Sequence, residues 1–194
     1  MDAFLKILQT LPEASELIAR VENGGCPAVL TGTAPVQRAC IGAAVAAGTG
    51  RPAVFLCADE REARQLAGDL QSLTGQIPVT LLAREWQFRP NAVASREWER
   101  SRLAALYRMA SGAVPAVVVT IDALMTRTLP PQRLAALSVT LRPGDRVELG
   151  ALTERLVQAG YSRCEQVEGV GQFAIHSGRF LPTDGAAGAL RIFR

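Results

Sequence analysis

Apolar positions along the first 130 residues follow two patterns, one typical of amphipathic helices and one of buried strands. Residues 4–22 carry apolar side chains at helical spacing, and Pro12 divides them into two short helices. Further along, short runs that are apolar throughout alternate with longer amphipathic segments. The runs predict strands at 28–30, 52–57, 79–82 and 117–121, and the longer segments predict helices at 35–47, 60–74, 95–111 and 123–126.

Strands that are apolar on both sides and alternate with helices indicate an α/β fold, in which a parallel sheet has helices on both faces. This pattern ends near Thr128, and Leu129-Pro130-Pro131 marks a change in composition. We therefore expect a first domain over residues 1–130.

The pattern is different after this boundary. A small α+β domain is predicted over 137–194, with a β-hairpin made of two alternating strands and a glycine-containing turn. Its elements are a strand at 138–141, a turn at 142–145, a helix at 149–160, hairpin strands at 163–167 and 172–176, a loop at 183–188 and a last strand at 190–193. Because the chain stops directly after a strand, we expect it to be a piece of something longer.

The stretch 28–47 predicts a strand, a tight turn and a helix, which is the geometry that cradles phosphates in nucleotide-binding α/β proteins. A phosphate loop of the form G-x-x-x-x-G-K-[ST] needs a lysine for the phosphates and a hydroxyl for magnesium. Neither is present, because the only lysine in the chain is Lys6. The loop is therefore degenerate, and its residues are Thr31, Gly32, Thr33, Ala34, Pro35 and Val36.

The degenerate loop is either a weak nucleotide site or a turn with only a structural role. A nucleotide could still bind through backbone N–H groups at the start of the helix. Against this, a proline at the first helical position has no N–H to offer, and Val36 has no group for magnesium. We therefore expect no cofactor and no metal, and interpret the loop as a scaffold turn.

Composition narrows the functional classes. The 194 residues include 21 basic and 18 acidic side chains, for a net charge of +3, and the two signs are mixed along the chain. This is typical of a solvated surface and not of a nucleic-acid stripe, so DNA binding is expected to be weak or absent. No signal peptide or membrane-spanning run is found, and the four cysteines form no C-x-x-C pair. We expect a cytoplasmic protein with buried, reduced thiols.

Several polar and aromatic residues have both a structural and a functional interpretation. The acids Asp59, Glu60 and Asp122 follow predicted strands, where they serve either as helix caps or as catalytic acids. Trp86, Phe88 and Trp98 either pack or stack on nucleic-acid bases. Their spacing has no period and glutamates surround them, which favours packing.

The predicted hairpin is different in kind. Arg163, Phe173 and His176 bring a guanidinium, an aromatic ring and the chain's single imidazole to one short element. Arginine and aromatic residues are the types favoured at protein interfaces. Either a solvated hairpin or a partner-binding hairpin fits the composition alone.

Three stretches together resemble the N-terminal module of the bacterial transcription-repair coupling factors (Mfd), which is similar to the excision-nuclease helicase subunit UvrB. The first is 30–36, where the helicase subunit has T-G-T-G-K-T; the second is PAVVVTIDAL at 115–124. The third and most specific is 141–178, from LRPGD to AIHSG. The resemblance covers essentially the whole chain.

This resemblance implies a helicase-like first domain that has lost ATP binding and a second domain that docks onto the damage-recognition subunit UvrA. The arginine after G-Y-x, here Arg163, contributes to that contact in the family. The family has a second arginine where this chain has His176, which lacks the bidentate fork of a guanidinium. The following segment also departs from the family. The partner-binding residues that we expect are Arg163, Phe173, His176, Arg179 and Phe180.

The expected function is therefore non-catalytic: a protein-binding module that recruits UvrA, with the remainder of a full-length chain as a further partner. Two alternatives stay open. One is a degenerate ATPase or helicase fragment with residual nucleotide binding, and the other is a fragment that contacts DNA.

Overall fold

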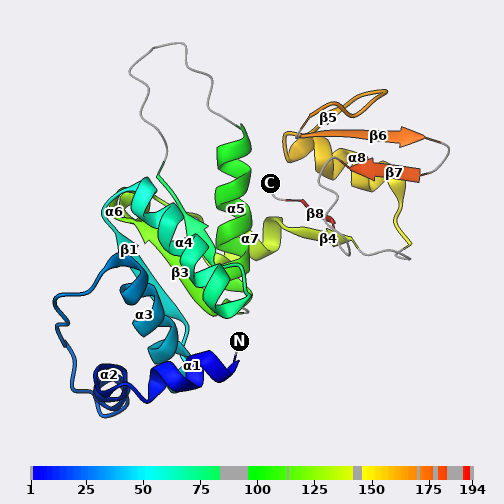
Figure 1. Cartoon of the computed structure of the whole chain (residues 1–194). Helices are drawn as coiled ribbons and strands as arrows, with labels where there is room; N and C mark the ends of the chain where they lie inside the picture. The colour runs from blue at the N-terminus through cyan, green and yellow to red at the C-terminus, as the bar shows by residue number, and fades with distance from the viewer. Residues whose placement is uncertain are drawn as a thin grey trace. The chain divides into compact units, whose positions relative to one another are not determined.

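The computed structural model of the chain describes residues 2–83, 96–112, 114–141, 146–169, 171–176, 179–182 and 190–192 (Figure 1). Its contacts divide the chain into two compact units, one of residues 1–86 and 108–127 and one of residues 87–107 and 128–194. The sequence pattern predicts a boundary near residue 130, whereas residues 87–107 group with the C-terminal unit in the structure.

The first unit is built on a three-stranded parallel sheet. Its strands are β1 (Ala53–Cys57), β2 (Val79–Leu81) and β3 (Ala116–Thr120), in the order β1-β3-β2. Both pairings are parallel, with Val117 of β3 opposite Val54 on one side and Val79 on the other. The predicted parallel α/β arrangement is thereby confirmed for these strands.

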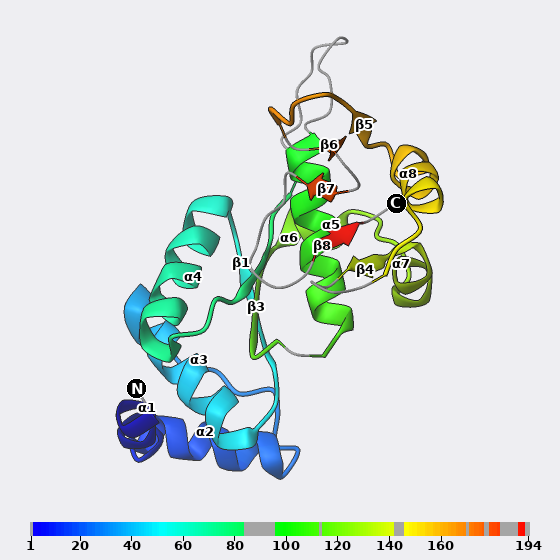
Figure 2. The ribbon, with the colours of Figure 1, turned by 90° about the vertical axis from the view of Figure 1, so that its right-hand side faces the viewer.

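Two helices cover one face of this sheet, α3 (Pro35–Thr49) and α4 (Glu60–Thr74), as Figure 2 shows from the side. The helices reach the strands through alanines, which allow close approach, and through leucines that fill the remaining space. The core is formed by Ala39, Ala43, Cys57, Ala63, Leu70, Ala116 and Val118. Gly42 of α3 lies directly against the ring of Phe55.

The opposite face of β1 is exposed. Val54 and Leu56 are 65% and 57% exposed, while Val117 and Val119, their neighbours on β3, are buried. The predicted cover of helices on both faces is therefore incomplete over β1 in the described part of the chain.

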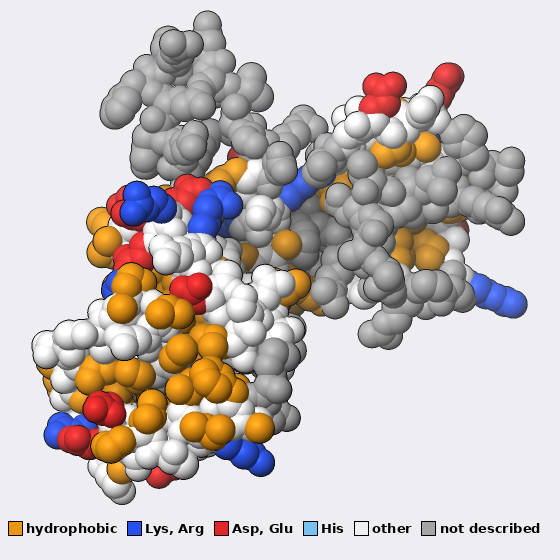
Figure 3. Space-filling view, in the orientation of Figure 1, with side chains coloured by type: hydrophobic (Ala, Val, Ile, Leu, Met, Phe, Trp, Pro, Cys, Tyr) orange, Lys and Arg blue, Asp and Glu red, His pale blue; other side chains and the backbone are white. Residues whose placement is uncertain are grey.

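Two short helices precede the sheet, α1 (Asp2–Gln9) and α2 (Pro12–Glu22), and Pro12 separates them as predicted. Both pack on α3, but α1 leaves Phe4 and Ile7 48% and 62% exposed. Figure 3 shows the hydrophobic side chains that gather at the surface of the first unit.

The strand predicted at 28–30 is wrong. These residues have no strand partner in the structure, and Val29 is 87% exposed. A strand needs a hydrogen-bonded neighbour, and an apolar run as short as this one cannot form a buried strand without one.

Helix caps agree only in part with the sequence pattern. Asp59 caps α4 as predicted, because its Oδ1 accepts a 2.8 Å hydrogen bond from the Glu62 N–H. The short helix α6 (Ile121–Met125) starts earlier than predicted, and its cap is Thr120, whose Oγ1 accepts from the Ala123 N–H at 3.4 Å. Asp122 is therefore not the cap but lies in the first turn of the helix, where its charge favours the dipole.

The second unit contains three helices and five strands among its described residues. The helices are α5 (Arg96–Ala110), whose last turn is shared with the first unit, α7 (Pro131–Leu137) and α8 (Leu149–Gln158). The strands are β4 (Val139–Leu141), β5 (Ser162–Arg163), β6 (Gln172–His176), β7 (Arg179–Pro182) and β8 (Leu190–Ile192). β4 pairs antiparallel with β8, and the other three form a sheet in the order β5-β6-β7.

The predicted hairpin between 163–167 and 172–176 is wrong in its pairing. β5 runs parallel to β6, with the Ser162 N–H bonded to the Gly171 carbonyl at 2.8 Å and the Cys164 N–H to the Phe173 carbonyl at 3.0 Å. The antiparallel hairpin of this unit lies one strand later, between β6 and β7. Residues 164–169 belong to no strand in the structure, whereas the alternating pattern predicts a strand as far as residue 167.

Some predicted features lie outside the described residues. They are Trp86, Phe88, the turn at 142–145 and the loop at 183–188.

Candidate functional sites

The degenerate loop leads directly into α3, whose first residue is Pro35. The Ala34 N–H, which a phosphate could otherwise use, donates a 2.8 Å hydrogen bond to Oε1 of Gln37. This is half of a capping box, in which a side chain of the helix satisfies its own N-terminal donors. Gly32 has φ +75°, so the turn itself is tight.

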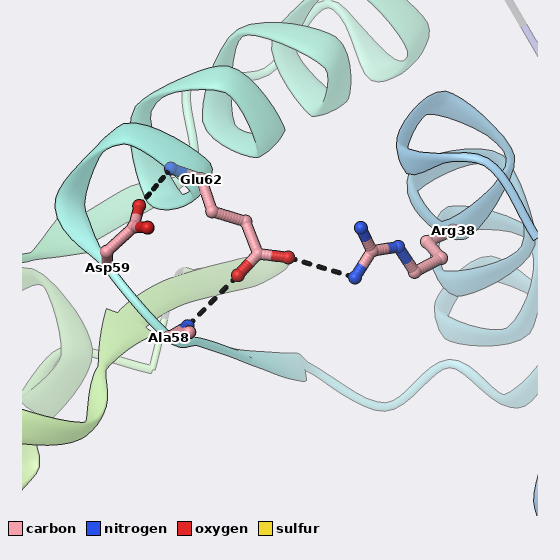
Figure 4. A network of polar contacts seen from close by, with 4 residues as sticks. All are labelled: Arg38, Ala58, Asp59 and Glu62. Carbon is pink, nitrogen blue, oxygen red and sulfur yellow. Dashed lines mark hydrogen bonds and ion pairs between the residues drawn. The ribbon is translucent and has the colours of Figure 1, made fainter.

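The first turn of α4 faces the first turn of α3 across a small polar network (Figure 4). The Glu62 carboxylate accepts from Nη1 of Arg38 at 2.9 Å and from the Ala58 N–H at 3.0 Å. Asp59 is turned toward the backbone of α4, as its capping bond requires. These charges are therefore engaged in holding helix starts together.

A cavity of about 370 Å³ lies beside this network, at the carboxyl end of β1. Ligands of open α/β sheets usually bind at this end of the strands. The charged side chains that line the cavity are Arg38, Asp59, Arg61, Glu62 and Asp69. Three carboxylates against two guanidiniums, one of which is already paired, form a poor environment for a polyphosphate.

The thiol of Cys57 also lines this cavity but is 2% exposed. Burial, followed by the charge of Glu62, raises its pKa above the usual 9.0, so the thiol stays protonated and is a weak nucleophile. Burial and the charge of Asp69 likewise raise the pKa of Cys40. Cys26 is exposed, so the expectation of buried thiols is wrong for that residue.

The second candidate site is the edge strand β5. Its register places Arg163 opposite Phe173 of β6. The Arg163 side chain is exposed, and the two backbone hydrogen bonds on either side of it fix the strand to β6. A guanidinium held on a fixed edge strand has five donors for a planar acceptor such as a carboxylate.

Phe173 has a different environment. Its ring is completely buried and packs with Leu152 and Leu156 of α8 and with Tyr161. The expectation that this ring is presented at the surface is wrong, because its side chain packs into the core of the second unit. Its contribution to the site is the support of the strand that holds β5.

The other three predicted residues lie at the β6–β7 hairpin. His176 pairs with Arg179, and Ile175 pairs with Phe180. The side chains of His176, Arg179 and Phe180 lie outside the described part of the structure. Their predicted role in partner binding stays a prediction.

The loop between β5 and β6 is held by a residue that the sequence pattern did not indicate. The side-chain oxygen of Gln172 accepts hydrogen bonds from the N–H groups of Glu168 at 2.8 Å and Gly169 at 3.1 Å. A single amide thus closes the loop that follows Arg163. The contact is local, over three and four positions, but the alternating pattern marks Gln172 only as a strand residue.

Two arginines of α5 contact aromatic rings, which the sequence pattern also did not indicate. Cζ of Arg100 lies 4.5 Å from the ring centroid of Tyr161, and Cζ of Arg102 lies 5.6 Å from that of Trp98. Trp98 therefore has a packing contact, as one of its two interpretations expects. Among the described residues there is no cluster of three or more metal-binding side chains and no helix suited to crossing a membrane.

No family model matches the chain. Individual curated proteins do. It is 28% identical over 180 residues to a transcription-repair-coupling factor of Bacillus subtilis, which is 92% of this chain and 15% of that protein. It is 30% identical over 190 residues to the one of Mycobacterium tuberculosis, again 92% and 15% of the two chains.

A third relative, the transcription-repair-coupling factor of Escherichia coli, is 28% identical over 125 residues, or 63% of this chain and 11% of the relative. The chain thus spans about a seventh of the length of the first two of these relatives. The chain is homologous to one segment of the transcription-repair coupling factors.

Proposed function

We propose that this chain is a non-catalytic protein-binding module, which docks onto the UvrA-type damage-recognition subunit of nucleotide-excision repair and so links repair to transcription. The observation that carries the proposal is the exposed Arg163 on an edge strand that backbone hydrogen bonds fix to a buried neighbour. The resemblance of residues 141–178 to the docking domain of the family adds to it.

The chemistry of the site indicates what the partner must offer. A fixed guanidinium is best matched by a carboxylate, which it binds through two parallel hydrogen bonds. Because β5 is two residues long and lies at the sheet edge, the partner reaches Arg163 without disturbing the core. We therefore expect an acidic side chain on the UvrA-type subunit to pair with Arg163.

The first unit supports a scaffold role better than a catalytic one. The loop at 31–36 lacks the lysine and hydroxyl that ATP chemistry needs, and Gln37 takes up a backbone donor at the start of α3. The neighbouring cavity is rich in carboxylates. In this proposal the α/β unit holds its place in a larger protein while the second unit makes the contact.

Titration of a UvrA-type subunit with the chain and its Arg163→Ala variant tests the proposal. We expect the variant to lose roughly 1–3 kcal/mol of binding free energy, which is about a fivefold to 150-fold weaker affinity. Arg155→Ala is the matched control, because Arg155 is an exposed arginine of the same unit on α8. Equal affinities of the wild-type chain and the Arg163 variant would refute the proposed docking site.

A further inference from the structure

Arg100 of α5 contacts two residues that flank Arg163 in the sequence, Tyr161 directly before β5 and Gly171 directly before β6. Its guanidinium stacks over the ring of Tyr161, the residue before β5, at 4.5 Å. The same guanidinium lies beside Gly171, the residue before β6, where it occupies the place of a Cβ atom. Both contacts lie within the second unit.

With the Arg100 guanidinium in place, there is no space for a side chain at Gly171. A Cβ atom at this position would lie 2.9 Å from Cζ of Arg100, closer than such atoms approach in real structures. Gly171 also has φ +90°, a conformation that other residues rarely adopt. A side chain at this position would therefore strain the backbone and displace the Arg100 guanidinium.

The arginine is held there by packing. Its Nη1 atom is buried and has no hydrogen-bond partner among the described residues. Tyr161 is itself buried, at 8% exposure, in the same cluster as Phe173. A planar guanidinium can fill the narrow space between a ring and a glycine, which the tetrahedral ammonium of a lysine fits less well.

These two contact points are joined by a hydrogen bond that sets the register of β5. The Ser162 N–H, next to Tyr161, donates to the carbonyl of Gly171 at 2.8 Å. One residue further on, Arg163 projects from the strand that this bond fixes. The Arg100 guanidinium therefore contacts Tyr161 and Gly171, which lie on the two sides of the hydrogen bond that positions β5 and Arg163.

We propose that Arg100 is a positioning residue for the partner-binding strand: by wedging between Tyr161 and Gly171 it fixes β5 against β6 and so presents Arg163. This inference rests on the proposed function for its consequence in binding. The effect of Arg100 on the conformation of β5 does not depend on a partner, and it can be measured in the isolated chain.

The first measurement needs no partner. Amide hydrogen exchange is compared in the wild-type chain, in Arg100→Ala and in Ser101→Ala, which changes an exposed neighbour on the same helix. We expect the amides of Ser162 and Cys164 to exchange about five- to thirtyfold faster in Arg100→Ala, the range for loss of a stacking contact. The amides of α8 should be unaffected, as should all amides of the control.

The second measurement is affinity for a UvrA-type subunit in a double-mutant cycle. Arg100→Ala should weaken binding several-fold when Arg163 is present and should add nothing in the Arg163→Ala background. A merely structural role would weaken binding equally in both backgrounds, and this result would overturn the proposal. Unchanged exchange at Ser162 and Cys164 would overturn it as well.

Arg100→Lys keeps the test decisive if Arg100→Ala does not fold. The lysine retains the charge and the aliphatic stem but not the plane, so intermediate exchange rates at Ser162 and Cys164 are expected, and wild-type rates would count against the wedge. If Arg163→Ala itself leaves affinity unchanged, the proposed function fails, while the exchange data still decide whether Arg100 fixes β5.

Discussion

The structure gives Phe173 a supporting role in the proposed docking site, and not a direct contact with the partner. Its ring is fully buried against Leu152, Leu156 and Tyr161. A buried aromatic side chain removes about 150–250 Å² from water, which at ~25 cal/mol per Å² is worth about 4–6 kcal/mol. Truncation to alanine keeps the Cβ atom but leaves a cavity, and the typical cost is about 3–5 kcal/mol.

This loss is a large fraction of the stability of a small domain, which is about 5–15 kcal/mol. We therefore expect Phe173→Ala to unfold the second unit at much lower denaturant than the wild-type chain, or to leave it unfolded. Hydrogen exchange resolved by peptide is the assay, because it reports on each element. Protection should fall over α8 and β6 and persist over α3 and α4, which belong to another core.

Val157→Ala is the matched control, because Val157 is an apolar residue of α8 that is 54% exposed. It should change stability by less than about 0.5 kcal/mol. A Phe173→Ala chain that keeps full protection over α8 would refute the reasoning, as would a loss of protection spread evenly over α3, α4 and α8. Reduced UvrA binding by Phe173→Ala with unchanged stability would instead restore the ring as a surface contact.

Two further predictions concern the first unit. Gly42→Ala should destabilise the first unit by about 1–3 kcal/mol in chemical denaturation, because a Cβ there would lie 2.7 Å from Cζ of the Phe55 ring. The control Gly68→Ala should stabilise it by up to about 1 kcal/mol, because Gly68 lies in an exposed part of α4 and a Cβ there would meet no atom within 4 Å. The opposite order of stabilities would contradict the packing of α3 on β1. Calorimetry with ATP and magnesium should show no heat of binding, since the loop lacks its lysine and carboxylates line the neighbouring cavity, and a micromolar dissociation constant would favour a working nucleotide site.

Local sequence signals predicted the three strands of the parallel sheet and every described helix except α7. Asp59 and Gly75 mark the ends of α4 in the sequence, and both have those roles in the structure, the first as an acceptor and the second in a left-handed conformation. The valine run of β3 is apolar at every position because both faces of the strand are buried. Such signals depend only on a residue and its near neighbours.

Pairing partners could not be predicted in the same way. The run at 28–30 has strand composition, but no strand of the described sheet pairs with it. The segment 163–176 alternates as a hairpin does, yet β5 and β6 run parallel in the structure, and the Gln172 side chain holds the backbone of Glu168 and Gly169 before β6. Arg100 is an ordinary helical arginine in the sequence, and only the fold brings it to Tyr161, 61 positions further along the chain.

The central claim is that the second unit of this chain binds a UvrA-type subunit through Arg163. Isothermal titration of the purified subunit with the wild-type chain tests it most directly. We predict saturable binding that Arg163→Ala weakens about fivefold to 150-fold and that Arg155→Ala leaves unchanged. Absence of heat and of any complex at high micromolar concentrations, with the second unit folded by hydrogen exchange, would contradict it.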